Sequence, residues 1–142
     1  MRRIFALRLG VGMLVSIMGL AAVAGCTGKS DIQANLGESF SLAAGQSAAI
    51  SGENLSIRFV ELISDSRCPQ GAVCIWEGEA SSIVDITYSG EVNRKMLVQP
   101  GITSFTDTNF GVYTISFQVN PYPEVGKDIK TQDYRLKLII SK

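Results

Sequence analysis

Two cysteines in the middle of the chain are the residues best suited to redox or metal chemistry. Cys68 and Cys74 close the seven-residue loop CPQGAVC. Disulfide oxidoreductases usually place a shorter gap between their cysteines, at a helix N-terminus that lowers the thiol pKa. A zinc site would need two further ligands, and the chain has no histidine to supply them. The spacing therefore favours a structural disulfide, which would remove about 2.4 kcal/mol of unfolded-state chain entropy for a loop of roughly 7 residues.

The lack of histidine also limits the catalytic chemistry that the chain can perform. It excludes Ser-His-Asp and Cys-His catalysis and histidine-metal sites. Glu77, Glu79 and Asp85 would share one face of a strand, where they could bind calcium or act as an acid–base pair. Calcium usually takes its oxygens from one acidic loop, and the sequence has no such loop. We therefore expect a solvated strand face, with no catalytic residue, metal or cofactor.

The N-terminal 25 residues have the pattern of a bacterial export signal. Three arginines precede the uncharged stretch from Leu9 to Gly25, and Val23-Ala24-Gly25-Cys26 matches a lipobox. The sequence predicts a lipoprotein signal peptide at 1–25 and an acyl anchor on the sulfur of Cys26. The alternatives are a plain secretory signal and an uncleaved anchor helix. The expected location is the extracytoplasmic side of a membrane in the cell envelope, which would be the outer membrane in a two-membrane cell.

The chain that follows the signal has the size of one small acidic domain. It contains 117 residues (142 − 25), and ten basic residues (13 − 3) face thirteen acidic ones, for a net charge of −3. Without a basic patch, nucleic acid is not an expected partner. Residues 26–37 are small and polar and predict a flexible tether, with a first edge strand as the alternative. Residues 38–142 are numerous enough to enclose a core.

Alternating apolar residues predict strands throughout this domain. The apolar positions of the expected strands are Phe40 and Leu42; Ala48 and Ile50; Leu55, Ile57 and Phe59; Trp76, Ala80, Val84, Ile86 and Tyr88; Met96 and Val98; Tyr113, Ile115, Phe117 and Val119; and Tyr134, Leu136, Leu138 and Ile140. The alternation breaks at Val60-Glu61, which indicates either a β-bulge or an edge strand with Glu61 in solvent. Residues 100–111 and 120–133 are expected loops. About seven strands predict an all-β, immunoglobulin-like sandwich, with a partly open barrel as the alternative.

The stretch from Asp65 to Ala80 carries a motif, D-x-R-C-P-x(4)-C-x-W-x-G-x-A. Its fixed positions are Asp65, Arg67, Cys68, Pro69, Cys74, Trp76, Gly78 and Ala80. In this motif the chain resembles a family of small exported bacterial lipoproteins whose function is uncharacterised. The strand pattern is also similar from about Phe40 to the C-terminus. The resemblance implies the fold and the disulfide, and it implies no activity.

Three residues of the motif have expected structural roles. If the strand alternation runs back to Trp76, its ring points inward and packs under the disulfide loop. Asp65 and Arg67 are expected to tie the loop down through a bidentate ion pair and backbone hydrogen bonds. The alternative is that these two residues face a partner.

Phe105, Phe110 and Tyr122 lie in or beside long loops and are candidates for an exposed binding patch. The alternative is that they fold back over the ends of the core.

These features predict a membrane-anchored lipoprotein with a non-catalytic domain that binds a protein or envelope partner or has a structural role in the envelope. An inhibitor of an exported hydrolase is the second hypothesis, and an enzyme is the third. Ordered aromatic loops would favour binding or inhibition, whereas a deep pocket with converging carboxylates would favour an enzyme.

Overall fold

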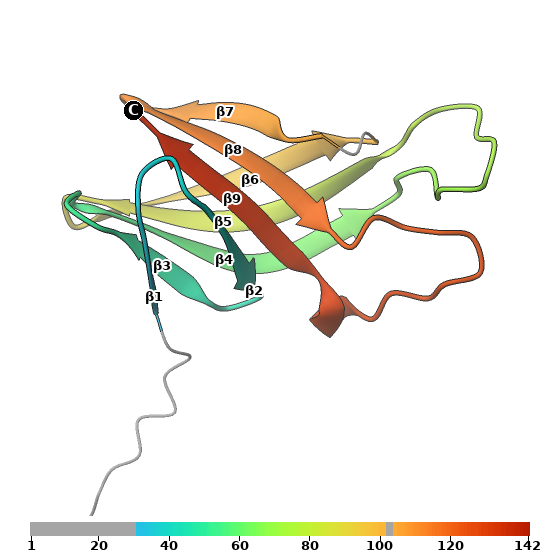
Figure 1. The fold of residues 1–142 in the computed structure, drawn as a ribbon, viewed down its shortest axis with the longest axis horizontal. Coiled ribbons are helices and arrows are strands. Elements are labelled where there is room, and N and C mark those ends of the chain that lie inside the picture. Colours follow the sequence, from blue (N-terminus) through green and yellow to red (C-terminus); the bar gives the residue numbers. More distant parts are fainter. Residues whose placement is uncertain (1–30, 102–103) are drawn as a thin grey trace, which may run out of the picture.

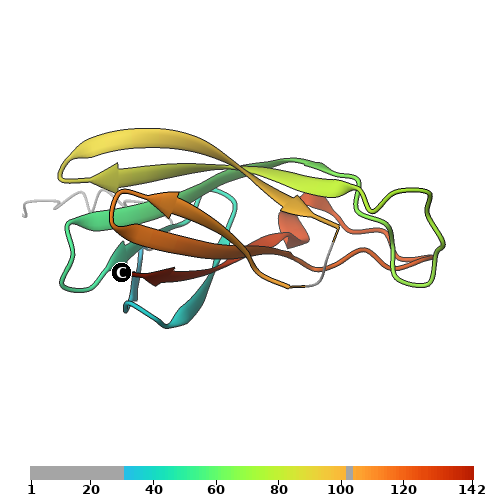
Figure 2. The ribbon, with the colours of Figure 1, turned by 90° about the horizontal axis from the view of Figure 1, so that it is seen from above.

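The computed structural model describes residues 31–101 and 104–142, which form two β-sheets packed face to face (Figure 1). The predicted signal peptide, Cys26 and the first part of the predicted tether lie outside these residues. Both sheets are open at their edges, so the domain is an all-β sandwich and not a closed barrel. The edge-on view in Figure 2 shows the two layers. Within the described residues, no helix is long and apolar enough to cross a membrane.

Nine strands make up the two sheets. The five-stranded sheet has the order β1-β3-β4-β5-β6, with β1 (Ile32–Ala34), β3 (Ser47–Ile50), β4 (Leu55–Asp65), β5 (Glu79–Tyr88) and β6 (Glu91–Pro100). The four-stranded sheet has the order β2-β9-β8-β7, with β2 (Ser39–Ala43), β9 (Arg135–Ser141), β8 (Tyr113–Asn120) and β7 (Thr106–Phe110). A short 3-10 helix, Thr131–Asp133, precedes β9. Only the β1–β3 pair is parallel among the paired strands of these two sheets.

The core lies between the sheets and is built from every second residue of the central strands, as the alternation predicts. The buried apolar side chains of β4, β5, β8 and β9 are Leu55, Ile57, Phe59, Ala80, Val84, Ile86, Tyr113, Ile115, Phe117, Val119, Leu136, Leu138 and Ile140. Because the intervening residues face outward, the two sheets cover one contiguous apolar layer.

β4 carries the bulge that the broken alternation indicates. Its pairing with β5 shifts register between Phe59 and Glu61, and again between Leu62 and Ser64. The first shift lies where the alternation fails in the sequence. It leaves Glu61 exposed and keeps Phe59 fully buried.

The prediction of a tether at 26–37 is wrong for its last residues. Ile32–Ala34 forms β1, which pairs with Ala48–Ile50 of β3. The alternative of a first edge strand is therefore confirmed. A segment of three residues is too short to show a period in the sequence, and its backbone pairing with β3 holds it in the sheet.

The prediction of one loop over 100–111 is also wrong, because Thr106–Phe110 forms β7. Among the described residues, this strand pairs only with β8, at the edge of its sheet. Its side chains alternate between exposed and half-buried, so it has no apolar period that could be read from the sequence.

In β6, the face that points into the core differs from the expected one. Met96 is 61% exposed, while Leu97 and Gln99 are buried. Gln99 occupies a core position because its Oε1 accepts a hydrogen bond of 2.6 Å from the backbone N–H of Val119. A buried amide with such a specific partner cannot be recognised from hydropathy alone.

Candidate functional site

The motif residues lie mostly in a loop, 66–78, that projects from one end of the sandwich (Figure 1). At its base, the N–H of Ser66 donates to the carbonyl of Glu79 and the N–H of Cys68 donates to the carbonyl of Glu77, both over 2.8 Å. The predicted disulfide joins Cys68 and Cys74, whose Cα atoms are 6.0 Å apart. Backbone pairing and a covalent bond therefore fix the path of this loop.

A second loop, 121–134, lies beside the first and braces it. The N–H of Gln70 donates to the carbonyl of Pro123 over 2.9 Å, and the N–H of Val125 donates to the carbonyl of Gln70 over 3.1 Å. The side chain of Val125 packs beside Gly71. The two loops thus form one structural unit at this end of the domain.

Arg67 holds both loops to the sandwich. Its guanidinium is fully buried and forms a bidentate ion pair with Asp65, with Nε–Oδ1 at 2.8 Å and Nη2–Oδ2 at 2.6 Å. It also donates to the carbonyls of Val119, over 2.8 Å, and Pro121, over 3.0 Å. The backbone N–H of Arg67 donates to Oδ1 of Asp65. The expected role of this pair in tying the loop down is confirmed.

The surroundings of Asp65 favour its charged form. Burial alone would raise the pKa of the Asp65 carboxyl, but hydrogen bonds and charge from Arg67, with a hydrogen bond from the Tyr134 hydroxyl, hold that pKa below its ordinary value of 3.8. Burial, together with the charge and hydrogen bond of Asp65, raises the pKa of Tyr134 to about 12. At neutral pH, Asp65 is therefore charged and Tyr134 is a neutral donor.

The prediction that Trp76 is buried is wrong: its side chain is 73% exposed. An inward Trp76 requires the strand alternation to run without a break from Ala80 back to Trp76. Gly78 interrupts this alternation, because its φ of +70° lies outside the extended region and β5 begins only at Glu79. Ala80, Val84 and Ile86 do point inward, as predicted, whereas Tyr88, expected on the same face, is 42% exposed at the end of β5.

The two smallest motif residues and the motif proline have clear local roles. A Cβ on Gly78 would overlap the backbone carbonyl of Ser66, so only glycine fits there. Ala80 is completely buried at the start of β5. The carbonyl of Pro69 accepts a hydrogen bond from the N–H of Ala72 over 3.1 Å, which closes a tight turn inside the disulfide loop.

The structure does not bring Phe105, Phe110 and Tyr122 together into one patch. Tyr122 folds back: its ring lies 4.7 Å from the Arg67 guanidinium, and its hydroxyl donates to the carbonyl of Gly101 over 2.9 Å. Phe105 is half-buried, with the ammonium of Lys137 over its ring. Phe110 ends β7 at the opposite end of the sandwich (Figure 1).

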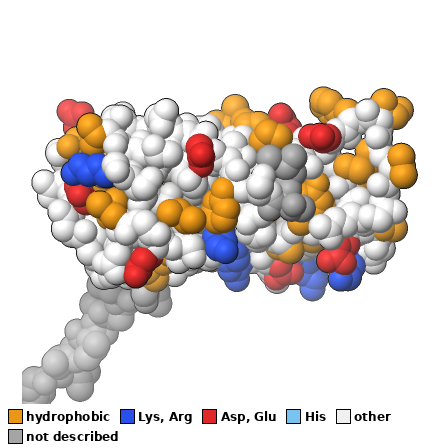
Figure 3. Space-filling view, turned by 45° about the horizontal axis from the view of Figure 1, so that its top comes forward, with side chains coloured by type: hydrophobic (Ala, Val, Ile, Leu, Met, Phe, Trp, Pro, Cys, Tyr) orange, Lys and Arg blue, Asp and Glu red, His pale blue; other side chains and the backbone are white. Residues whose placement is uncertain are grey.

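Four exposed apolar side chains that the sequence reading missed lie on the two braced loops instead. Ile75 is 107% exposed, Val73 104%, Trp76 73% and Val125 60%. We call this group the apolar tip; Figure 3 shows hydrophobic side chains gathered at this end of the molecule. The run Ala72-Val73-Cys74-Ile75-Trp76 could have indicated it, because it is apolar without alternation and is closed by a disulfide.

The carboxylates considered for calcium or acid–base chemistry do not converge. Asp85 forms a bidentate ion pair with Arg94 of β6, with Nε–Oδ1 at 2.7 Å. Glu79 is the first residue of β5 and lies six positions before Asp85, roughly 20 Å away along the strand. Within residues 31–101 and 104–142, no three Cys, Asp or Glu side chains are grouped so that they could hold a metal.

We predict that Arg67→Ala lowers the free energy of unfolding by about 3 to 5 kcal/mol, because it leaves a buried carboxylate unpaired. The matched control is Arg94→Ala, which breaks a pair whose arginine side chain is 65% exposed and should cost about 0.2 to 1 kcal/mol. Denaturant unfolding measures both changes.

The loss of unfolding free energy caused by Arg67→Ala should also depend on pH. The pKa of Asp65 is lowered in the folded wild type, so this contribution to stability is present above pH 3.8 and is lost as the pH falls through the lowered pKa. The difference between the wild type and Arg67→Ala should therefore shrink under acid. Equal losses for Arg67→Ala and Arg94→Ala at neutral pH would contradict the anchoring role.

For Trp76, we predict that replacement by Ala changes the free energy of unfolding by no more than about 0.5 kcal/mol, as is usual for surface positions. The control is Phe59→Ala, which empties a fully buried position in β4 and should cost about 3 to 5 kcal/mol. Tryptophan fluorescence of the native protein should be red-shifted and quenched by iodide. A blue-shifted, protected Trp76 would show that the ring is covered.

Comparison with known proteins gives no match to any family model, to any curated protein or to any solved structure.

Proposed function

We propose that this protein is a lipid-anchored, extracytoplasmic binding protein that captures a protein partner with its apolar tip. The observation that supports this most directly is the full exposure of Val73 and Ile75 beside an exposed Trp76 on a loop that is otherwise firmly held. Contiguous exposed apolar side chains are uncommon on soluble domains and usually mark interaction surfaces. Tryptophan is also among the residues that most often dominate binding energy at protein interfaces.

The bracing of the tip favours tight binding. A loop that is ordered before binding loses little conformational entropy when a partner closes over it. Three contacts fix the backbone beneath the exposed side chains. They are the disulfide, the backbone hydrogen bonds of Ser66 and Cys68 at the base of the loop, and the hydrogen bond between Gln70 and Val125. The tip is therefore suited to insertion into a preformed apolar cleft.

The charges around the tip indicate what should line the rim of that cleft. Residues 68–79 and 121–133 carry five carboxylates, Glu77, Glu79, Glu124, Asp128 and Asp133, against two lysines, Lys127 and Lys130. This excess of negative charge would be complemented by basic residues on the partner. It would be repelled by an anionic membrane surface, so a protein partner is favoured over lipid for this end of the domain.

An inhibitor of an exported hydrolase is the second candidate function. It is supported by the shape of loop 66–78, in which the fully exposed Val73 and Ile75 flank the disulfide-bonded Cys74 at one end of the domain. Such a protruding, covalently closed loop could occupy an active-site cleft. In that case the partner would be an enzyme that loses activity when it binds.

Anchoring at Cys26 is compatible with presentation of the tip. The described chain begins at Asp31, five positions after Cys26, and β1 lies toward the end of the sandwich away from the tip (Figures 1 and 2). An anchor at that position would leave the tip accessible to other envelope proteins.

We predict that Cys26→Ser releases the protein from membranes or leaves it unprocessed, because the lipid is attached through the sulfur. Mass spectrometry of the membrane-bound wild type should find a thioether-linked diacylglycerol on Cys26. Recovery of the wild type as a soluble chain, cleaved at another position and without lipid, would contradict the anchoring.

We predict that a photo-crosslinking residue at position 75 traps a specific envelope protein when the full chain is produced in its host, whereas one at position 96 does not. Met96 is a matched control because it is apolar and 61% exposed but lies on the flank of the sandwich. With the trapped protein purified, Trp76→Ala should weaken binding about 30-fold, the effect of a residue that contributes roughly 2 kcal/mol. Met96→Ala should leave binding unchanged.

Salt and activity measurements complete this test. Binding should weaken as the ionic strength rises, because complementary rim charges are screened. If the partner is a hydrolase that Trp76→Ala no longer inhibits, the second candidate function is the correct one. Equal crosslinking from positions 75 and 96, or crosslinking only to lipid at position 75, would refute the role of the tip.

A further inference from the structure

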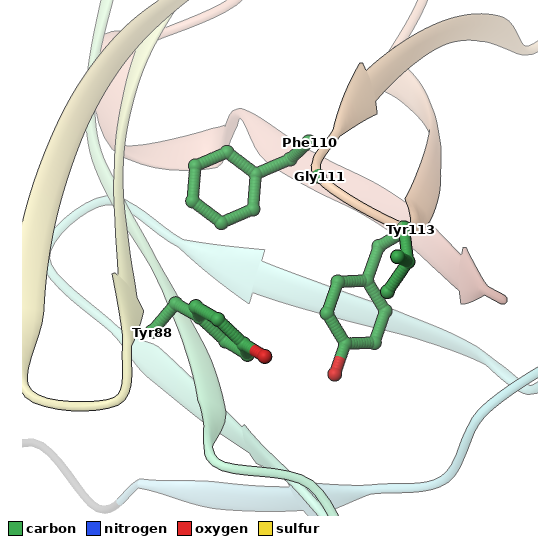
Figure 4. Close-up of a pocket in the computed structure, with 5 residues that line it drawn as sticks. Tyr88, Phe110, Gly111 and Tyr113 are labelled. Atoms are coloured by element: carbon green, nitrogen blue, oxygen red, sulfur yellow. The ribbon is translucent and has the colours of Figure 1, made fainter.

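A pocket lined by aromatic residues lies at the end of the sandwich opposite to the apolar tip. It has a volume of about 130 Å³ and is lined by Tyr88, Phe110, Gly111, Val112 and Tyr113 (Figure 4). Tyr88 ends β5, while the other lining residues form the turn between β7 and β8. Because β5 runs from the loop base at Glu79 to Tyr88, the pocket is roughly 30 Å from the tip. It is therefore a separate site from the one in the proposed function.

Three aromatic rings surround this pocket without stacking flat on one another. The ring of Tyr88 meets Phe110 at 81° with centroids 6.4 Å apart, and meets Tyr113 at 69° with centroids 5.9 Å apart. In Figure 4 the three rings border one open space, and both tyrosine hydroxyls lie on the same side of it. Ring surface is thus available to the C–H groups of a ligand.

The polar groups near the pocket are the two tyrosine hydroxyls and the residues bonded to Tyr113. The Tyr113 hydroxyl donates to Oε2 of Glu53 over 2.6 Å, and the ammonium of Lys142 donates to Oε1 of Glu53 over 3.1 Å. The Tyr88 hydroxyl makes no hydrogen bond to any residue in the described part of the chain. A ligand in the pocket would therefore find the free Tyr88 hydroxyl beside an apolar ring surface, whereas Glu53 and Lys142 are connected to the pocket through Tyr113.

The hydrogen bond from Tyr113 keeps these groups in fixed protonation states. It raises the pKa of Tyr113 to about 12, with burial as the second cause, and it lowers the pKa of Glu53 together with Lys142. Across the neutral range, Glu53 is an acceptor and Tyr113 a donor.

Two lysines make this pocket unsuitable for a cation. The Lys142 Nζ lies 5.5 Å from the centre of the Tyr113 ring, and the Lys95 Nζ lies 5.7 Å from the centre of the Phe110 ring. A quaternary ammonium, which aromatic pockets often bind, would meet two positive charges already at these rings.

We propose that this pocket binds one neutral saccharide ring. The apolar C–H face of a pyranose would pack against the Tyr88 and Phe110 rings. Its hydroxyl groups would exchange hydrogen bonds with the Tyr88 hydroxyl, which can both donate and accept. A small number of polar groups beside an apolar, concave surface is the usual composition of a small-molecule site.

The test uses the full-length protein in detergent and saturation-transfer NMR with glucose, N-acetylglucosamine and their β-1,4-linked trimers. We expect transfer to at least one of these sugars, with a dissociation constant on the order of 1 mM, as for a ligand of this size. Transfer should be strongest at the C–H groups of one ring. Tetramethylammonium should neither bind nor compete.

Variants then locate the binding. Tyr88 is 42% exposed, so Tyr88→Ala should fold and should weaken sugar binding at least tenfold. Tyr88→Phe keeps the ring and removes the hydroxyl, so we expect a loss of about threefold to fivefold. The control, Met96→Ala, and the tip variant, Trp76→Ala, should bind sugar like the wild type.

Other results would overturn the proposal. These are the absence of transfer to every sugar, preferential binding of tetramethylammonium, and sugar binding that survives Tyr88→Ala. Loss of sugar binding in Trp76→Ala would also overturn it, because the sugar would then bind at the apolar tip.

Discussion

The buried guanidinium of Arg67 is the contact on which the arrangement of this end of the domain depends. It links Asp65, the last residue of β4, to Val119 of β8, and so joins the two sheets by charged hydrogen bonds. It also holds Pro121 and stacks on Tyr122, which fixes the start of the second loop. A fully buried cation costs several kcal/mol in desolvation unless its donors are satisfied, so these partners must all be present at once.

This requirement explains how an exposed loop can be well ordered. Loop 66–78 has little core of its own, because Val73, Ile75 and Trp76 point to solvent. Its order comes from polar and covalent contacts at its base: Arg67, the Cys68–Cys74 bond and the approach of Gly78 to Ser66. A loop stabilised only by buried apolar side chains would have to bury the residues that this one exposes.

The sequence was informative wherever a local rule decides the structure. The spacing of Cys68 and Cys74 predicts their disulfide, and the alternation of β4, β8 and β9 predicts which residues form the core. Even the bulge at Phe59–Glu61 could be located, because a bulge shifts the alternation by one residue. In each case the determining information lies within a few neighbouring residues.

The predictions fail where contacts between residues far apart in the sequence decide the structure. Gln99 is buried because Val119, twenty residues away, donates to it, and β7 is a strand because it pairs with β8. The predicted burial of Trp76 is wrong because the alternation does not continue across Gly78, whose left-handed backbone ends the strand pattern. The approach of Gly78 to Ser66, which requires a glycine, is visible only in three dimensions.

The exposure of Trp76 also changes how the motif is understood. If the ring were buried, the motif would be explained entirely by the stability of the domain. In the structure, the other motif residues have structural roles: Arg67, Pro69, Gly78, Ala80 and the disulfide. The exposed ring of Trp76 has no such role in holding the fold. An exposed tryptophan contributes little to the free energy of folding of an isolated domain, because its ring remains in water. The residues around it form a rigid support, and the free energy available from burying the ring can be gained only when another molecule covers it.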